Sequence, residues 1–345
     1  MDTQRSPLDF HPRTCWPEYR PTDLVELPAL ARHAGVGRVL AKLENQRPLS
    51  NFKSLGGFCA GLRALARHAG LRSLEQVRSH RGVLPPLLCA SEGNHGLAVA
   101  AAAQHAGTRA CVYLSAGVSD QRAARIEGLG SRVIRVDGTY DDAVQAAKDA
   151  EAAGAGLLIP DTSNDPFDVA VADVMDGYAV IARELAVQFR ELIGDRPSHG
   201  FIQAGVGGLA AAMARGLADH WRWPGQLLTV EPEHAACVAT ALEYGHPRLV
   251  GGDLRTTATM LACGLASAPA VQTLRRHGAR GMTVSDAELE AAVHVLARDG
   301  GPATTPSGAA GVAGLLRVAG DPGMRSVHML SSESCVLLLI TEAAL

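Results

Sequence analysis

The sequence predicts an α/β fold of two domains, with parallel sheets flanked by helices. Short apolar runs alternate with longer helical patterns along nearly the whole chain, which is typical of consecutive βαβ units. The length of 345 residues corresponds to roughly two domains of ordinary size. Hydrophobic residues make up 47% of the chain and charged residues 19%, a balance that supports a buried core and excludes a disordered chain.

The individual elements follow from this alternation. Strands are expected over eight short runs, which are residues 39–43, 87–89, 110–114, 133–136, 157–159, 200–203, 227–230 and 336–340. Helices are expected over residues 53–69, 95–105, 120–129, 140–153 and 169–192. Ligands of open α/β sheets bind beyond the carboxyl ends of the strands, so the junctions from strand to helix are the places to look for chemistry.

The helix expected over residues 53–69 shows the clearest periodicity. One face is apolar at spacings of three and four residues, and it comprises Leu55, Phe58, Cys59, Leu62 and Ala66. Such spacing predicts that this face is buried, with Arg63 and Arg67 turned away from the core.

Charge and composition exclude several classes of function. Lys and Arg number 32 against 35 Asp and Glu, which gives a net charge of −3 and argues against a nucleic-acid partner. The longest apolar stretches, residues 97–103 and 336–340, are too short to cross a membrane. The first twenty residues lack the apolar segment of a signal peptide. Seven scattered cysteines without a C-x-x-C pair favour a cytoplasmic protein with no disulfide framework and no metal site.

The first junction of interest is the stretch N-F-K-S-L-G-G, which contains Lys53. A lysine at a helix start lies in the positive field of the helix dipole, and its amine loses a proton more readily. A neutral amine is what Schiff-base formation with an aldehyde cofactor requires. The alternative is a surface lysine in a first helical turn.

The second junction is the stretch A-S-E-G-N-H-G, which contains Glu92 and Asn94. Its two glycines let the backbone approach a ligand, and the Asn94 amide offers both a donor and an acceptor. The alternatives are an ordinary helix cap for Asn94 and a solvated loop charge for Glu92.

The third junction is the loop of Gly205, Val206, Gly207, Gly208 and Leu209, which follows a predicted strand. Successive backbone N–H groups at a helix start form a cradle suited to phosphate. The same loop also fits a loose dinucleotide fingerprint, with an acidic residue, Glu231, at the end of the next strand. Taken alone, this segment leaves NAD binding and a simple phosphate site open.

Together the three junctions resemble the pyridoxal-phosphate enzymes of the tryptophan synthase β and threonine dehydratase fold, known as fold type II. The resemblance implies that Lys53 forms a Schiff base with pyridoxal 5'-phosphate, that Asn94 lies beside the cofactor ring and that residues 205–209 bind its phosphate. A dinucleotide-dependent dehydrogenase gives no reason for the two upstream junctions.

Within this fold the chain resembles the diaminopropionate ammonia-lyase family from about residue 10 to residue 342. The matching segments are Y-R-P-T-D-L at residue 19, N-F-K at 51, the acid before G-N-H-G, D-T at 161, D-G-Y at 176, T-M-L-A-C-G-L-A at 259 and the terminal T-E at 341. The chain departs from the family at Glu92, where an aspartate is usual, and at Pro306, where the usual residue is a glutamate.

The resemblance implies α,β-elimination on 2,3-diaminopropionate or a similar small β-substituted amino acid, giving pyruvate and ammonia. It also implies a cytoplasmic homodimer, with a large cofactor domain of residues 1–53 and 151–345 and a small mobile domain of residues 54–150. A serine or threonine dehydratase and an amino-acid racemase are alternatives on the same fold. An NAD-dependent dehydrogenase and an inactive binding module are alternatives of other classes.

Three further site residues follow from the resemblance. Thr341 is expected beside the pyridine nitrogen of the cofactor, and Asp161 on the substrate side. Glu92 is expected on the cofactor face opposite Lys53, where it would serve as a second base for one enantiomer. The alternatives are a strand-end threonine for Thr341, a helix cap for Asp161 and a solvent-facing glutamate for Glu92.

Overall fold

The computed structural model describes residues 8–16, 19–91 and 93–344, and the chain divides into two compact units. The first unit comprises the described residues of Met1–Arg20, with Lys53–Asp161 and Asp168–Val180. The second unit comprises Pro21–Phe52, Thr162–Phe167 and the described residues of Ile181–Leu345. The first unit thus extends beyond the domain expected over residues 54–150, because strand β6 (Leu157–Leu158) pairs with its sheet.

The first unit is built around a four-stranded parallel sheet with the order β5-β4-β3-β6. The other strands are β3 (Leu87–Ser91), β4 (Ala110–Ser115) and β5 (Arg132–Val136). The helices are α1 (Pro12–Cys15), α3 (Lys53–His68), α4 (Glu75–Ser79), α5 (Asn94–His105), α6 (Asp120–Glu127), α7 (Tyr140–Ala152) and the first part of α8 (Val169–Gln188).

Helices α3 and α5 pack closely because small residues face each other. A Cβ atom on Gly57 would lie 2.9 Å from the Cβ of Ala98, and one on Gly61 would lie 2.8 Å from the Cβ of Ala102. Distances this short leave no room for a larger side chain. The five apolar residues predicted to form the inner face of α3 are all buried, which confirms the periodicity.

Arg63 departs from that prediction. Its side chain is buried, and its guanidinium pairs with Asp173 at 2.8 Å and with Asp176 at 3.1 Å, both on α8. Arg67 is exposed as expected, although it also contacts Asp173. Arg63 does lie outside the apolar face of α3, as predicted, but this side of the helix faces α8 rather than solvent.

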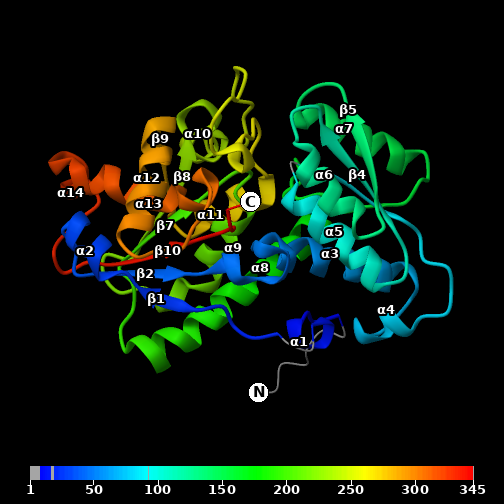
Figure 1. The fold of residues 1–345 in the computed structure, drawn as a ribbon, viewed down its shortest axis with the longest axis horizontal. Helices are drawn as coiled ribbons and strands as arrows, with labels where there is room; N and C mark the ends of the chain where they lie inside the picture. Colours follow the sequence, from blue (N-terminus) through cyan, green and yellow to red (C-terminus); the bar gives the residue numbers. More distant parts are fainter. Residues whose placement is uncertain (1–7, 17–18, 92, 345) are drawn as a thin grey trace. The chain divides into compact units, whose positions relative to one another are not determined.

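The second unit contains a six-stranded sheet with the order β1-β2-β10-β7-β8-β9, antiparallel only between β1 and β2. Its strands are β1 (Leu24–Glu26), β2 (Arg38–Lys42), β7 (His199–Gln203), β8 (Gln226–Pro232), β9 (Arg280–Val284) and β10 (Cys335–Leu339). Figure 1 shows the last strand, β10, beside β2 near the start of the chain, and Leu339 is the register partner of Lys42.

The helices of the second unit are α2 (Pro28–Ala34), the rest of α8, α9 (Gly208–Gly216), α10 (Cys237–Tyr244), α11 (Ala268–Arg276), α12 (Asp286–Arg298), α13 (Pro306–Gly320) and α14 (Pro322–Val327). A π-helical turn, Phe189–Ile193, ends α8. Short 3₁₀ segments cover Glu44–Gln46, Pro48–Ser50, Ala218–His220, Glu233–Ala235 and Thr259–Leu261. One hydrophobic core joins α2, α12 and α13 to the sheet, with Leu30, Leu296 and Leu315 packed in the same cluster as Val230 and Leu338.

The structure confirms the α/β class and the parallel sheets. Each of the eight expected strands is present, and β1 and β9 were not predicted. Strand β9 begins with the exposed residues Arg280 and Gly281, so it lacks the apolar run that marks a central strand. Within the described residues, no helix combines the length and the apolar character that crossing a membrane requires.

Candidate active site

Lys53 begins helix α3, and its Nζ atom donates to Oδ2 of Asp161 at 2.6 Å. The first turn of α3 is held firmly against α8. A Cβ atom on Gly177 would lie 2.5 Å from the carbonyl oxygen of Leu55, and one on Gly56 would lie 2.3 Å from the Tyr178 ring. The predicted D-G-Y segment is therefore a packing surface that fixes the start of the lysine helix.

Asp161 is a buried carboxylate that accepts two hydrogen bonds. Its Oδ2 binds Lys53, and its Oδ1 accepts from the hydroxyl of Tyr140 at 2.8 Å. Burial alone would raise the pKa of Asp161, but the charge of Lys53, the nearby His95 and the two hydrogen bonds outweigh it and hold the pKa below its ordinary value. Asp161 is thus a fixed negative charge bound to side chains, and these contacts are not those of a helix cap.

The loop before α5 is shaped by Ser91. Its Oγ accepts from the backbone N–H groups of Gly93 at 2.8 Å and Gly96 at 2.8 Å. Gly93 has φ +135°, a conformation that side chains other than hydrogen rarely allow. This turn places Asn94, which is partly buried, at the first position of α5. Glu92 lies outside the described residues.

His95 links this loop to the strand that precedes Asp161. Its Nε2 is 2.8 Å from the carbonyl oxygen of Ile159, and its ring is fully buried. Burial lowers the pKa of His95, with the charge of Asp161 acting in the opposite direction. A neutral ring whose Nε2–H donates to Ile159 leaves Nδ1 as a buried acceptor, and Nδ1 has no partner among the described residues.

Two of these groups, Tyr140 and His95, were not predicted as site residues. Tyr140 begins α7 directly after Thr139, whose hydroxyl caps that helix, so its place at the start of a helix was the available signal. His95 stands within the predicted G-N-H-G stretch, where its neighbour Asn94 was chosen. The first unit therefore brings together Lys53, Asp161, Tyr140 and His95.

In the second unit, the glycine loop joins β7 to α9. Gly207 has φ +97°, and a Cβ atom on it would lie 3.1 Å from Val238 and 3.2 Å from Ala270. Two carbonyl groups of the loop point into the protein. That of Gly205 accepts from the Cys237 thiol, and that of Val206 accepts from the N–H of Ser267. The loop ends at the first turn of α9, where N–H groups have no intrahelical acceptor.

Thr341 lies just beyond the end of β10 and is buried. Its Oγ1 accepts from Nε2 of Gln203 at 3.0 Å. The same nitrogen also faces the carbonyl oxygens of Ser307, Gly308 and Leu339 at 3.0 to 3.3 Å. Three carbonyl neighbours require the amide nitrogen, rather than its oxygen, at this position. The Thr341 hydroxyl is thus an acceptor toward Gln203, and its own proton is directed elsewhere.

Glu231 does not fit the dinucleotide alternative. Both of its carboxylate oxygens are occupied at the start of α10, where they accept from the N–H groups of Val238 at 2.7 Å and Ala239 at 2.6 Å. The side chain is fully buried, and burial raises its pKa to about 8. The acidic residue that should bind a ribose is instead a helix cap.

The residues present fit pyridoxal phosphate. A lysine at a helix start, a glycine loop that leaves little room for a side chain at Gly207, and a buried hydroxyl that accepts from Gln203 match an aldehyde, a phosphate and a ring nitrogen in turn. The fold and these groups define a fold type II enzyme that uses this cofactor.

A family model described as "Pyridoxal-phosphate dependent enzyme" matches residues 15–332, and the chain belongs to this family. It is 32% identical over 338 residues to diaminopropionate ammonia-lyase of Escherichia coli K12, covering 94% of this chain and 84% of that protein. The holo crystal structure of the E. coli ammonia-lyase matches with a TM-score of 0.84 and 29% identity, covering 94% and 85% of the two chains. The complex of that enzyme with D-serine matches with a TM-score of 0.85 and 28% identity, covering 98% and 90%. These findings confirm the predicted family, fold and cofactor.

Proposed function

We propose that this enzyme is an ammonia-lyase that converts 2,3-diaminopropionate to pyruvate and ammonia by α,β-elimination. The contact between Lys53 and Asp161 carries the proposal. Once the lysine amine is bound to the cofactor, the buried Asp161 carboxylate needs another cation near it. The β-ammonium group of diaminopropionate supplies that charge, whereas the hydroxyl group of serine does not.

Residues from the three predicted junctions, together with Thr341, hold the cofactor in this proposal. Lys53 binds its aldehyde carbon, the backbone of residues 205–209 binds its phosphate, Asn94 lies beside its ring, and Thr341 donates its hydroxyl proton to the ring nitrogen. The last assignment is supported by the contact with Gln203, in which the Thr341 hydroxyl accepts and its own proton is not used. When bound, the cofactor supplies an electron sink for the carbon that loses a proton.

The chain's own residues move protons and bind the substrate. Lys53 accepts the proton from the α-carbon on its side, the bond between the β-carbon and its nitrogen breaks, and the first ammonia leaves. Hydrolysis with one water releases the second ammonia and pyruvate. Asp161, held by Tyr140, keeps the β-nitrogen in its charged form and in place as a leaving group. Glu92 is proposed as the base on the opposite face.

Serine is the second candidate substrate. An E. coli ammonia-lyase of similar fold has been crystallised with D-serine, and elimination of water from serine also gives pyruvate. The hydroxyl of serine is neutral, so its hydrogen bond to Asp161 would be weaker than that of a charged ammonium group. A lower rate on serine than on diaminopropionate is therefore expected.

A cytoplasmic homodimer with a mobile small domain over residues 54–150 completes the proposal. All seven cysteines are free thiols, a state that a reducing compartment maintains. Sedimentation equilibrium of the purified holoenzyme measures the oligomeric state.

The test is a turnover screen of both enantiomers of diaminopropionate, serine and threonine, with pyruvate or 2-oxobutyrate and ammonia as the readouts. Diaminopropionate should give the highest kcat/KM, with two ammonia molecules per pyruvate. Lys53→Ala should lose this activity together with the visible absorption of lysine-bound cofactor. Preferred turnover of serine or threonine, or an unchanged spectrum in Lys53→Ala, contradicts the proposal.

A further inference from the structure

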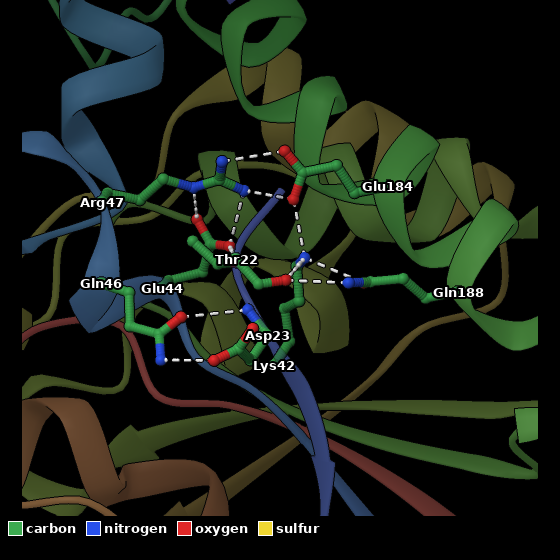
Figure 2. A network of polar contacts seen from close by, with 8 residues as sticks. All are labelled: Thr22, Asp23, Lys42, Glu44, Gln46, Arg47, Glu184 and Gln188. Carbon is green, nitrogen blue, oxygen red and sulfur yellow. Dashed lines mark hydrogen bonds and ion pairs between the residues drawn. The ribbon is translucent and has the colours of Figure 1, made fainter. Parts of the chain in front are cut away.

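A buried charge cluster lies in the second unit (Figure 2). It comprises two cations, Lys42 and Arg47, and two carboxylates, Glu44 and Glu184. Their side chains are between 0% and 6% exposed. The charges balance, which is the condition under which such groups are found in a protein interior.

Arg47 is the centre of this cluster. Its guanidinium binds Glu44 through Nε and Nη2, both at 2.8 Å, and binds Glu184 through Nη1 at 2.8 Å and Nη2 at 2.7 Å. Figure 2 shows the planar group between the two carboxylates. Only arginine can bind two carboxylates in this paired geometry.

Lys42 completes the cluster from strand β2. Its Nζ donates to Glu184 at 2.6 Å, to Gln188 at 2.9 Å and to the carbonyl oxygen of Thr22 at 2.7 Å, which uses all three of its protons. The Thr22 hydroxyl in turn donates to Glu44 at 2.8 Å. Every charged group is thus held in one geometry.

A buried charge cluster is weak evidence for a contribution to stability. Replacing a buried ion pair with apolar residues of similar volume is often neutral or stabilising, because the desolvation of the charges offsets their attraction. A buried polar network is therefore expected to serve a geometric purpose. The position of Arg47 in the chain indicates which one.

Arg47 directly precedes a strained turn. Leu49 has φ +68° and Ser50 has φ +61°, which are left-handed conformations at two successive residues with side chains. Such conformations are strained, and residues with side chains keep them only where the surroundings hold them. The Arg47 carbonyl accepts from the Ser50 N–H at 2.8 Å, and the Asn51 side chain donates to the Leu49 carbonyl at 2.8 Å.

The chain after the turn pairs with the C-terminal segment. The Ala343 N–H donates to the Ser50 carbonyl at 3.0 Å, Asn51 forms a β-bridge with Glu342, and the Phe52 N–H donates to the Thr341 carbonyl at 3.0 Å. The next residue is Lys53. A turn that relaxed to the right-handed region would shift this pairing.

We propose that Arg47 is a positioning residue, which holds the left-handed turn at Leu49 and Ser50 and so sets the pairing of residues 50–52 with the C-terminal segment, directly before Lys53. The role of Lys53 rests on the function proposed above. The role of Arg47 in fixing the turn does not depend on it.

The test compares two charge-balanced double variants. Arg47→Met/Glu44→Gln removes the ion pairs of Arg47 with Glu44 and Glu184. It keeps the ion pair of Lys42 with Glu184. Lys42→Met/Glu184→Gln removes one cation and one carboxylate from the same cluster but leaves Arg47 bound to Glu44. Hydrogen exchange of the Phe52 and Ala343 amides in the cofactor-free protein is the main readout, measured relative to amides of strand β8.

The Phe52 and Ala343 amides should exchange at least tenfold faster in the Arg47 double variant than in the Lys42 double variant. The affinity for pyridoxal phosphate should be lower in the Arg47 double variant by a similar factor. Equal exchange rates in the two variants overturn the proposal. Arg47→Lys keeps the charge balance without the paired geometry; it is the milder test if the double variant does not fold, and the same selective acceleration is expected.

Leu49→Gly supplies an independent check, because glycine adopts positive φ without strain. When Leu49→Gly is added to the Arg47 double variant, it should reverse at least half of the increase in the logarithm of the exchange rate of these two amides. An exchange rate that stays the same contradicts the proposal. Exchange in the cofactor-free protein does not involve the Lys53 amine. The two proposals can therefore fail separately. If the two amides exchange faster in the Arg47 double variant and the cofactor spectrum of Lys53→Ala is unchanged, the proposed function is refuted and the role of Arg47 is supported.

Discussion

The backbone N–H of Phe52 donates to the carbonyl oxygen of Thr341 at 3.0 Å, although the two residues lie near opposite ends of the chain. Phe52 directly precedes the lysine assigned to the cofactor, and Thr341 is the residue assigned to its ring nitrogen. One hydrogen bond thus joins the backbone next to Lys53 to the backbone of Thr341. This relationship depends on β10 lying beside β2 and β7 in the sheet.

The phosphate assignment predicts the behaviour of two variants at Gly207. Both Gly207→Ala and Gly207→Asp introduce a Cβ atom at φ +97°, close to Val238 and Ala270, so they share the same backbone strain. Only aspartate adds a negative charge at the start of α9. The dissociation constant for pyridoxal phosphate should be about 2- to 30-fold higher for the aspartate variant than for the alanine variant, because the helix-end interaction with an anion, about 0.3–2 kcal/mol, is lost. Equal dissociation constants in a fluorescence titration would place the phosphate elsewhere.

Thr341 is predicted to keep the ring nitrogen unprotonated, since its hydroxyl accepts from Gln203 and its own proton can be donated to that nitrogen. Thr341→Asp should fold, because the Gln203 amide can donate to the new carboxylate. A carboxylate would favour the protonated nitrogen and make the cofactor a stronger electron sink, so racemised or transaminated products should increase relative to pyruvate. Thr341→Ser keeps the hydroxyl and is the control. An unchanged product ratio in the aspartate variant argues against this assignment.

The sequence predicted the junctions better than the contacts between them. Lys53 was chosen at a predicted helix start, and Asp161 because it follows a predicted strand and lies in the D-T segment that resembles the ammonia-lyase family. Tyr140, Gln203 and Arg47 each bind a partner 21 or more residues away, which is Asp161, Thr341 and Glu184 in turn, and no local pattern reveals those pairs. Arg63 illustrates the same limit, since its polar position on α3 gave no sign that Asp173 would meet it in the interior.

Asp161 is predicted to act on substrate more than on cofactor. Asp161→Asn removes the charge and keeps the shape of the side chain. The value of kcat/KM for diaminopropionate should fall by about 10- to 100-fold, the effect of losing a charge-assisted hydrogen bond of about 1.5–3 kcal/mol, while the affinity for pyridoxal phosphate changes much less. Tyr140→Phe removes one neutral hydrogen bond to the same carboxylate and should have a smaller effect. Matching losses of turnover and cofactor affinity in Asp161→Asn would indicate a structural role.

Glu231 is predicted to make folding stability depend on pH. Burial raises its pKa from 4.5 to about 8, so the folded state retains a proton that the unfolded state loses above about pH 4.5. Its contribution is fully present below pH 4.5 and is lost as the pH rises through 8, with a slope of up to about 1.4 kcal/mol per pH unit. Glu231→Gln cannot titrate, and urea denaturation between pH 5 and 9 should show a shallower decline for this variant. Parallel curves for the two proteins would refute the assignment.

The last prediction concerns Glu92, which the sequence places two residues before Asn94. The α-proton leaves perpendicular to the plane of the cofactor, so an enzyme that accepts both enantiomers needs a base on each face. Lys53 serves one face, and a carboxylate at position 92 would serve the other if burial raises its pKa toward neutrality. Glu92→Ala should therefore lose activity on D-diaminopropionate while activity on the L-enantiomer survives.

Glu92→Asp is the matched variant, because it restores the shorter acid that the resembled family usually carries. The missing methylene shifts the carboxylate by about 1 Å, a displacement that can change a proton-transfer rate by on the order of 10²-fold. The ratio of D to L activity should therefore differ between the unaltered enzyme and the Glu92→Asp variant, while the cofactor spectrum stays the same. Both enantiomers are assayed by pyruvate release. If Glu92→Ala loses both activities equally, or if the unaltered enzyme does not act on a D-amino acid, a second base at this position is excluded.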